Sequence, residues 1–299
     1  MKPIFIIGIA GRSGTHYLKQ LLIKHNDIEK SILKREDHFI SELNYLDLYV
    51  KNISYYWKRK DPEHEKNIIN SLKIGLGKGI IDFAKADKKA KYFLLNTPYT
   101  HNIQLFEKFF PNNKLIIITR NAKDLVESGV RSKFWNYEEG FELWNKSAKR
   151  LIEFQKKSNY PIKIVKYEDL FLDTENQLNK IFEYLELKNE NYIFENAKNI
   201  AVQGSSDAKN DKKNWEYKNI KKTDNFKPLS RAEKWGVLKK WRYNWKCGKN
   251  SLLLNYEDEE IKFYPLYFIL NIFFDIFLSI YKLKLFIKSK IIKQRAKKL

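Results

Sequence analysis

The sequence predicts an α/β fold in which a parallel β-sheet is flanked by helices on both faces. Short, continuous apolar runs such as 3–9 and 114–119 have the length and β-branched content of strands that are buried on both sides. Longer segments with helical spacing of their apolar residues separate these runs, and this alternation is typical of parallel sheets. A glycine-rich turn joins the first strand to the first helix, as it does in many nucleotide-binding domains.

The expected elements follow one another along the chain. Strands are expected at 3–9, 91–96, 114–119 and 162–166. Helices are expected at 14–25, through most of 37–90, at 102–110, from 122 onwards, at 138–157 and around 180–187. The polar segment 203–228 is interpreted as a long loop, and long loops in compact domains are usually lids, binding loops or disordered segments.

The chain has 299 residues, of which 43% are hydrophobic, enough for one large domain or two small ones. We expect one domain over 1–250 and a basic, apolar helical segment over 251–299. The net charge of +21 comes mainly from lysine spread along the chain, with only nine arginines, so compositional background explains most of it. The sequence has no zinc-finger spacing and no RNA-binding aromatic motif, and nucleic acid is therefore not an expected partner.

The single cysteine, Cys247, cannot form an intrachain disulfide, so the chain does not require an oxidising compartment. No Cys/His cluster with metal-binding spacing occurs in the sequence. Near the N-terminus, the apolar stretch 4–7 is too short for a signal peptide or a membrane span. These features predict a cytoplasmic catalytic domain.

The turn after the first strand reads Gly-Ile-Ala-Gly-Arg-Ser-Gly-Thr over residues 8–15. A Walker A loop needs Gly-Lys before its Ser or Thr, whereas here no Lys precedes Thr15 and Arg12 stands inside the turn. Glycines let the backbone approach an anion, and the amides of residues 13–16 would point at it from a helix N-terminus. Arg12 adds a planar cation suited to sulfate or phosphate oxygens. The alternative is a tight strand-to-helix connection that binds no ligand.

Arg12 and the three residues after it resemble the 5′-phosphosulfate loop of sulfotransferases that use 3′-phosphoadenosine 5′-phosphosulfate (PAPS). The Arg variant is similar to tyrosylprotein sulfotransferases and many bacterial relatives, whereas cytosolic members usually have Lys there. The resemblance follows the family's motif order over roughly residues 3–245. It implies a P-loop-type three-layer sandwich, PAPS as the donor without a metal, and an acceptor hydroxyl on a glycan, lipid or other metabolite. The implied donor-binding residues of the loop are Gly11, Arg12, Ser13, Gly14, Thr15 and His16.

Arg120 ends the third expected strand, and Ser128 follows eight residues later on the next helix. The resemblance implies that this pair holds the 3′-phosphate of the donor. An Arg at the carboxyl end of a strand faces the ligand crevice of an open α/β sheet. Ser128, two turns into its helix, can donate a hydrogen bond to the same phosphate. Taken alone, Arg120 could instead form a surface ion pair with Asp124.

Three later segments also match family patterns. Tyr167 opens a Tyr-Glu-Asp-Leu segment after the fourth expected strand, which implies a contact with adenine; the alternative is an aromatic at the edge of the core. Lys234 lies in a segment that resembles the late Lys-Pro…Ser-Lys-Trp motif and is implied to contact a donor phosphate. Ser205 and Ser206 resemble a Ser-containing turn that also contacts the donor. For these residues the alternative is a solvated basic loop.

Sulfuryl transfer requires a base for the acceptor proton and cations for the oxygen that leaves. In relatives that carry Arg in the loop, a Glu soon after the first helix is the base, and Glu36 stands in that place. His38 is the second candidate, because an imidazole titrates near neutral pH. Alternatively, both residues belong to a charged helix start and neither is catalytic. Arg12 completes the predicted catalytic set as the cation.

Asn96 departs from the family pattern. After the second expected strand the family often has a Lys before Ser/Thr-Pro, where this chain has Asn-Thr-Pro. A carboxamide can hydrogen-bond a sulfuryl oxygen but carries no charge, so Arg12 would stabilise more of the transferred charge.

Residues 264–283 are nearly all apolar and long enough to span a bilayer. Asp275 near their middle and the basic residues that follow argue against spanning. A helix lying on an anionic membrane is therefore favoured, at the cytoplasmic face, while packing on the protein or on a partner remains an alternative.

Two other functions are compatible with parts of the sequence. One is a nucleotide kinase of P-loop type, which the missing Gly-Lys pair and the presence of Arg120 and Ser128 disfavour. The other is a non-catalytic, membrane-associated binding module that retains the donor pocket.

Overall fold

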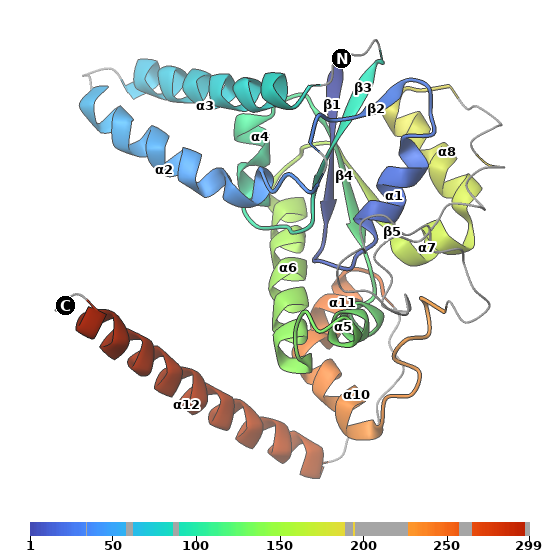
Figure 1. The fold of residues 1–299 in the computed structure, drawn as a ribbon, viewed down its shortest axis with the longest axis vertical. Helices are drawn as coiled ribbons and strands as arrows, with labels where there is room; N and C mark the ends of the chain where they lie inside the picture. Colours follow the sequence, from blue (N-terminus) through green and yellow to red (C-terminus); the bar gives the residue numbers. More distant parts are fainter. Residues whose placement is uncertain are drawn as a thin grey trace.

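The computed structural model of the chain describes residues 1–33, 35–57, 62–85, 90–188, 194, 227–256 and 265–296. At its centre lies a five-stranded parallel sheet with the strand order β2-β3-β1-β4-β5 (Figure 1). The strands are β1 (Lys2–Gly8), β2 (Ile28–Lys30), β3 (Tyr92–Thr97), β4 (Lys114–Thr119) and β5 (Ile162–Lys166). The predicted α/β class is confirmed, and the four expected strands are β1, β3, β4 and β5.

Strand β2 was not predicted from the sequence. It has three residues, lies at the edge of the sheet and pairs only with β3. Of its residues only Ile28 is buried, so no continuous apolar run marks it as a strand.

Helices cover both faces of the sheet in a three-layer arrangement (Figure 1). On one side lie α1 (Thr15–Leu22), α7 (Tyr167–Leu172) and α8 (Thr174–Leu185). On the other side lie α2 (Leu43–Ser54), α3 (Pro62–Ala84), α4 (Phe106–Phe109) and α6 (Tyr137–Lys157), with the short turns η1 (Ile40–Glu42), η2 (Tyr55–Trp57) and η3 (Ile103–Leu105). Helix α5 (Ala122–Arg131) follows β4 directly. Of the loop expected at 203–228, only the last two positions fall within the described residues.

Alternating residues of the strands supply the two layers of the core, as the pleat of a strand requires. Ile4 and Ile6 of β1 belong to a cluster formed with α1 and α8. Phe5 and Ile7 belong to a larger cluster formed with α4 and α6. All four side chains are at most 1% exposed, which explains why β1 is a continuous apolar run.

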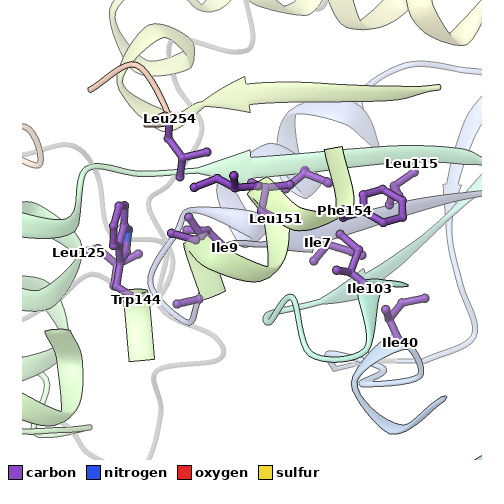
Figure 2. Close-up of a cluster of buried hydrophobic side chains, with 14 of the residues drawn as sticks. Ile7, Ile9, Ile40, Ile103, Leu115, Leu125, Trp144, Leu151, Phe154 and Leu254 are labelled. Atoms are coloured by element: carbon purple, nitrogen blue, oxygen red, sulfur yellow. The ribbon is translucent and has the colours of Figure 1, made fainter. Parts of the chain in front are cut away.

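Trp144 on α6 joins the larger cluster to the edge of the sheet where the strands end. Its side chain is fully buried, and its Nε1 donates a hydrogen bond to the carbonyl oxygen of Arg120 at 3.0 Å. Figure 2 shows it next to Leu125, with Leu151 and Phe154 further along the same helix. The core therefore fixes the backbone of Arg120 directly.

The C-terminal part of the chain continues this core before it leaves the domain. Helix α10 (Val237–Tyr243), a π-helical turn η4 (Asn244–Gly248) and α11 (Lys249–Leu253) pack against α6. Leu254 and Tyr256 are members of the larger core cluster. Helix α12 (Pro265–Ala296) then begins beside α10, and its far end lies apart from the other helices (Figure 1).

Replacement of Trp144 tests whether the core holds the end of β4. Trp144→Ala should lower the free energy of unfolding by about 3–5 kcal/mol, because it removes a fully buried aromatic side chain. Trp144→Phe should lower it by about 1–3 kcal/mol, because the carbonyl of Arg120 loses its donor. Urea unfolding followed by circular dichroism measures both changes. The control Tyr56→Ala, at a side chain that is 83% exposed, should change stability by less than about 0.5 kcal/mol.

Candidate functional site

Residues from four separate parts of the chain meet where the parallel strands end. The turn 8–15 follows β1, Asn96 lies at the end of β3, Arg120 follows β4 and Tyr167 follows β5. Because parallel strands have their carboxyl ends at one edge, their following residues converge there, which is where open α/β sheets bind ligands. The structure therefore brings together most of the residues predicted to bind the donor.

The turn between β1 and α1 is built to present its backbone. Arg12 and Gly14 both have positive φ angles, of 73° and 97°. Residues with positive φ that alternate with residues of negative φ direct successive amides toward a common anion site. The Ser13 hydroxyl donates to the carbonyl of Ala10 at 2.5 Å and accepts from the amide of Ala10 at 3.0 Å. Its hydroxyl thus shapes the turn, and what Ser13 offers a ligand is its backbone amide.

Arg12, Ser128 and Arg120 lie in direct contact, although more than one hundred residues separate the first from the other two. The Nε of Arg12 donates to the Ser128 hydroxyl at 3.2 Å. Arg120 Nη1 donates to the carbonyl of Arg12 at 2.9 Å. The Arg12 guanidinium therefore contacts the Ser128 hydroxyl, and the Arg120 guanidinium contacts the backbone of the same turn. Guanidinium and hydroxyl donors of this kind suit a phosphate or sulfate.

Tyr167 packs between the turn and Arg120. A Cβ atom on Gly14 would lie 2.3 Å from the Tyr167 ring, so only glycine fits at that position. The guanidinium carbon of Arg120 lies 4.4 Å from the centre of the same ring, which is a cation–π arrangement. Tyr167 is 3% exposed, and burial raises the pKa of its phenol. The phenol of Tyr167 therefore stays neutral while its ring packs against Arg120.

Arg120 is buried rather than at the surface. Its side chain is 4% exposed, and Nη2 donates to the carbonyl of Pro228 at 2.7 Å. Asp124, the surface ion-pair partner considered from sequence, is 7% exposed and accepts a hydrogen bond from the amide of Ala232 at 3.2 Å. The Nε of Arg120 is buried and has no hydrogen-bond partner among the described residues, so the group has donor capacity left for a ligand.

The segment that begins at Lys227 contacts both Arg120 and Asp124, through the carbonyl of Pro228 and the amide of Ala232. Trp235 is buried, and its Nε1 donates to Glu127 of α5 at 2.7 Å. This anchor leaves the side chain of Lys234 exposed to solvent, whereas Arg231 is 4% exposed. The cation that the segment places near Tyr167 and Asp124 is therefore Arg231, whose charge acts to lower the pKa of both groups against the effect of burial.

The loop that carries Glu36 is attached to the end of β3 through Asp37. The Asp37 amide donates to the carbonyl of Asn96 at 3.0 Å. Its carboxylate accepts from the Asn96 amide and, at 2.7 Å, from the Thr97 hydroxyl. These bonds hold Glu36 beside the sheet edge, although it comes from a different part of the chain.

Glu36 lies among several charged groups. Burial raises the pKa of its carboxyl, while His38, Lys19 and Arg12 act to lower it. The Nε2 of His38 is 3.9 Å from a Glu36 oxygen, and His38 has a positive φ of 56°. Burial lowers the pKa of Lys19, which is 5% exposed. Glu36 is therefore a half-buried carboxylate whose pKa is raised by burial, and Arg12 and Lys19 reduce the size of that rise.

Asn96 is the most unusual polar group of the edge. Its side chain is 2% exposed, and neither its Oδ1 nor its Nδ2 has a hydrogen-bond partner among the described residues. Leaving a buried polar group unsatisfied costs about 1–3 kcal/mol. A buried carboxamide in this state at the rim of an anion site is suited to bind part of a ligand.

Sequence reasoning missed several residues of this edge. Lys19 stands one helical turn after Thr15 and could have been noticed by that spacing alone. Asp37 is adjacent to the predicted base, but its bonds to β3 depend on the tertiary fold. Trp135 wedges between Gly129 and Gly140, and a Cβ on Gly129 would lie 1.9 Å from it. His16 lies partly buried on α1, and the predicted contacts Ser205 and Ser206 lie outside the described residues.

The comparisons with known proteins agree on one family. A model described as the sulfotransferase family matches residues 3–191 of the chain. The chain is similar to the sulfotransferase domain of the olefin synthase from Synechococcus PCC 7002, with 17% identity, a TM-score of 0.54, and coverage of 86% of this chain and 96% of that one. It is also similar to the sulfotransferase domain of the curacin biosynthetic pathway, with 18% identity, a TM-score of 0.50, and coverage of 87% and 99%. No curated protein sequence matches it significantly.

Gly14→Ala tests the contact between the turn and Tyr167. The added Cβ meets the ring and occupies a backbone conformation with positive φ, so we expect a loss of stability of at least about 1–3 kcal/mol in urea unfolding. The matched control is Gly75→Ala in α3, where a Cβ meets nothing within 4 Å. That substitution should stabilise the protein by about 0.4–1 kcal/mol. Equal effects of the two substitutions would contradict the packing described for Gly14.

Proposed function

Since the chain belongs to the sulfotransferase family and is a sulfotransferase, we propose that it transfers a sulfuryl group from PAPS to a hydroxyl of a glycan, lipid or other metabolite. The observation that carries the proposal is the contact of Arg12 with Ser128 and Arg120 at the ends of β1 and β4. Family membership also decides against the nucleotide kinase considered from sequence.

The two phosphate-bearing ends of the donor would be held by different parts of this cluster. The amides of the turn and Arg12 suit the 5′-phosphosulfate, because they lie at the N-terminus of α1. Arg120 and Ser128 suit the 3′-phosphate, and binding there would replace the internal bonds of Arg120 with bonds to phosphate oxygens. The ring of Tyr167 packs against the guanidinium of Arg120 and is proposed to contact the adenine.

Glu36 is proposed as the base. As the acceptor oxygen forms its bond to sulfur, the Glu36 carboxylate takes the hydroxyl proton. The bond between sulfur and the bridging oxygen breaks, and the negative charge that develops there is stabilised by Arg12. The products are a sulfate ester and adenosine 3′,5′-bisphosphate.

Asn96 is proposed to contact the sulfuryl group. Its carboxamide is buried beside the loop of Glu36, through the bonds that Asp37 makes to β3. An Nδ2 donor there can bind a sulfuryl oxygen and so satisfy a group that the described part of the protein leaves without a partner.

The acceptor is proposed to approach from the side of α2. Exposed aromatic side chains lie along this helix and the turn that follows it, namely Tyr45, Tyr49, Tyr55 and Tyr56. Aromatic faces bind the apolar surfaces of sugars and lipids at little entropic cost. This surface therefore fits acceptors larger than a simple alcohol.

Binding of adenosine 3′,5′-bisphosphate tests the donor site without knowledge of the acceptor. Isothermal titration should show binding that does not depend on magnesium and exceeds that of ATP. Arg120→Ala should weaken it by about 2–5 kcal/mol, or on the order of 30- to 5,000-fold, and Ser128→Ala by roughly fivefold. Unchanged affinity in folded Arg120→Ala protein would overturn the assignment of the 3′-phosphate site.

Asn96→Ala separates the donor site from the transfer step. Adenosine 3′,5′-bisphosphate lacks the sulfuryl group, so its affinity should stay within about twofold of the unsubstituted protein while sulfate transfer falls on the order of tenfold or more. A screen with donor labelled in the sulfuryl group, over glycans and lipids, measures transfer. Donor binding without transfer to any acceptor would favour the non-catalytic binding module.

The pH dependence of transfer tests the base. A carboxylate base must be ionised, so the rate should rise with pH through the pKa of Glu36, which burial raises. Lys19→Met removes a charge that lowers this pKa, and the acid limb of the profile should therefore move to higher pH, whereas Lys19→Arg should restore its position. The control Lys149→Met, at a side chain that is 71% exposed on α6, should leave the limb in place.

Glu36→Gln should reduce transfer on the order of 100-fold or more without weakening adenosine 3′,5′-bisphosphate. His38→Gln should have an effect below tenfold. The reverse order would assign the base to His38, and full activity in both variants would remove this pair from the mechanism.

A further inference from the structure

Helix α12 contacts the rest of the protein along one narrow stripe. Within the described side chains of α12, those that are not exposed are Tyr267, Asn271, Asp275 and Leu278. Lys282 continues the series by pairing with Glu142 of α6. These positions recur every three or four residues and therefore lie on one face of the helix.

The stripe is polar and is held by charged groups of the domain. Arg242 of α10 donates to Asn271 Oδ1 at 3.0 Å and to Asp275 at 2.6 Å, while Glu138 of α6 accepts two bonds from it at 2.7 and 2.8 Å. Lys246 and Trp245 also donate to Asp275. Burial acts to raise the pKa of Asp275, but these donors lower it to about 2. The carboxylate that argued against a membrane-spanning helix is thus ionised and paired with Arg242 and Lys246 of the domain.

The remaining surface of α12 is apolar and exposed. The window Pro265–Lys284 has a mean hydropathy of 1.7, and only 6% of it is buried. Its large exposed side chains include Leu266, Ile269, Leu270, Ile272, Phe273, Ile276, Phe277, Ile280 and Leu283. This is the reverse of a helix that packs on its own domain, where the apolar face is inward. A continuous apolar surface of this kind indicates an interaction site.

The charge of the residues that follow Asp275 indicates which kind of surface binds the apolar side of α12. No acidic residue follows Asp275, whereas Lys282, Lys284 and several further basic residues do, and the whole chain carries +21. An apolar helix face that continues into a basic segment complements acyl chains beneath anionic headgroups. A second copy of this chain offers the same basic segment and would repel it.

We propose that α12 lies in the interface of an anionic membrane, with the stripe of Asn271, Asp275 and Lys282 toward the domain and the apolar remainder toward the acyl chains. Asp275 and Lys282 are about 10 Å apart along the helix axis, and both are tied to the domain. Over these turns the helix is therefore fixed against the domain. A spanning helix would have to break these pairs and bring Asp275 to the bilayer centre. The inference is independent of the proposed reaction, and it places the domain at the cytoplasmic face, where anionic lipid is exposed.

Flotation of the full chain with lipid vesicles tests this inference. The protein should float with phosphatidylcholine vesicles that contain roughly one quarter phosphatidylglycerol, and much less with phosphatidylcholine alone. Phe273→Glu combined with Phe277→Glu should weaken binding by roughly 100-fold or more, because each buried Phe contributes about 1.5–3 kcal/mol. The control Leu172→Glu combined with Phe83→Glu introduces the same two charges at side chains of α7 and α3 that are 74% and 61% exposed, and it should leave flotation unchanged.

Three outcomes would overturn the proposal. The first is failure of the full chain to float with anionic vesicles, or flotation of the double variant at the level of the unsubstituted protein. The second is a dimer in light scattering that the double variant converts to monomer while vesicles have no effect, which would make a second copy the occupant. The third is protection of the basic C-terminal segment from trypsin added outside intact vesicles. An interfacial helix leaves that segment accessible, whereas a spanning helix carries it into the lumen.

Discussion

The candidate site depends on holding the guanidinium of Arg120 buried and oriented at the end of β4. A buried cation is costly unless hydrogen bonds and neighbouring groups compensate for lost hydration. Here the compensation comes from the whole fold: the carbonyls of Arg12 and Pro228 accept from its two terminal nitrogens, and Tyr167 offers its ring. Arg12 follows β1, Tyr167 follows β5, and Pro228 lies in the late segment that Trp235 anchors to α5. The anion site is therefore complete only when the whole domain has folded.

The backbone of this edge is fixed as firmly as its side chains. Trp144 donates to the carbonyl of Arg120, and Glu168 accepts from the amide of Asn121 at 2.8 Å. Burial raises the pKa of Glu168, and the bond from Asn121 acts against that rise. The Tyr-Glu-Asp-Leu segment therefore has two functions: its Tyr supports the arginine and its Glu secures the start of α5. This explains on structural grounds why the segment directly follows the last strand.

Residues that belong to local motifs could be predicted from sequence, and residues placed by tertiary contacts could not. Arg12 and Arg120 follow the ends of β1 and β4, and Ser128 lies on the helix after β4, so motif spacing was sufficient to predict that they meet. The late segment was also found, but packing of Trp235 turns Lys234 outward and places Arg231 inside, which spacing cannot show. The short edge strand β2 was missed because pairing with β3, rather than an apolar run, makes it a strand.

The residues proposed to bind the donor and the proposed base, Glu36, are positioned by different parts of the fold. Most of the residues proposed to bind the donor directly follow strands, so the register of the parallel sheet sets their positions. Glu36, in contrast, lies in a loop that Asp37 ties to the end of β3, and the charged groups that act on it are His38, Lys19 and Arg12. Because α2 takes no part in these bonds to β3, substitutions of its exposed aromatic side chains can be made without moving Asp37 or the end of β3. The proposed acceptor surface on α2 is thus separate from the residues proposed to bind the donor, since only the latter are positioned mainly by the sheet.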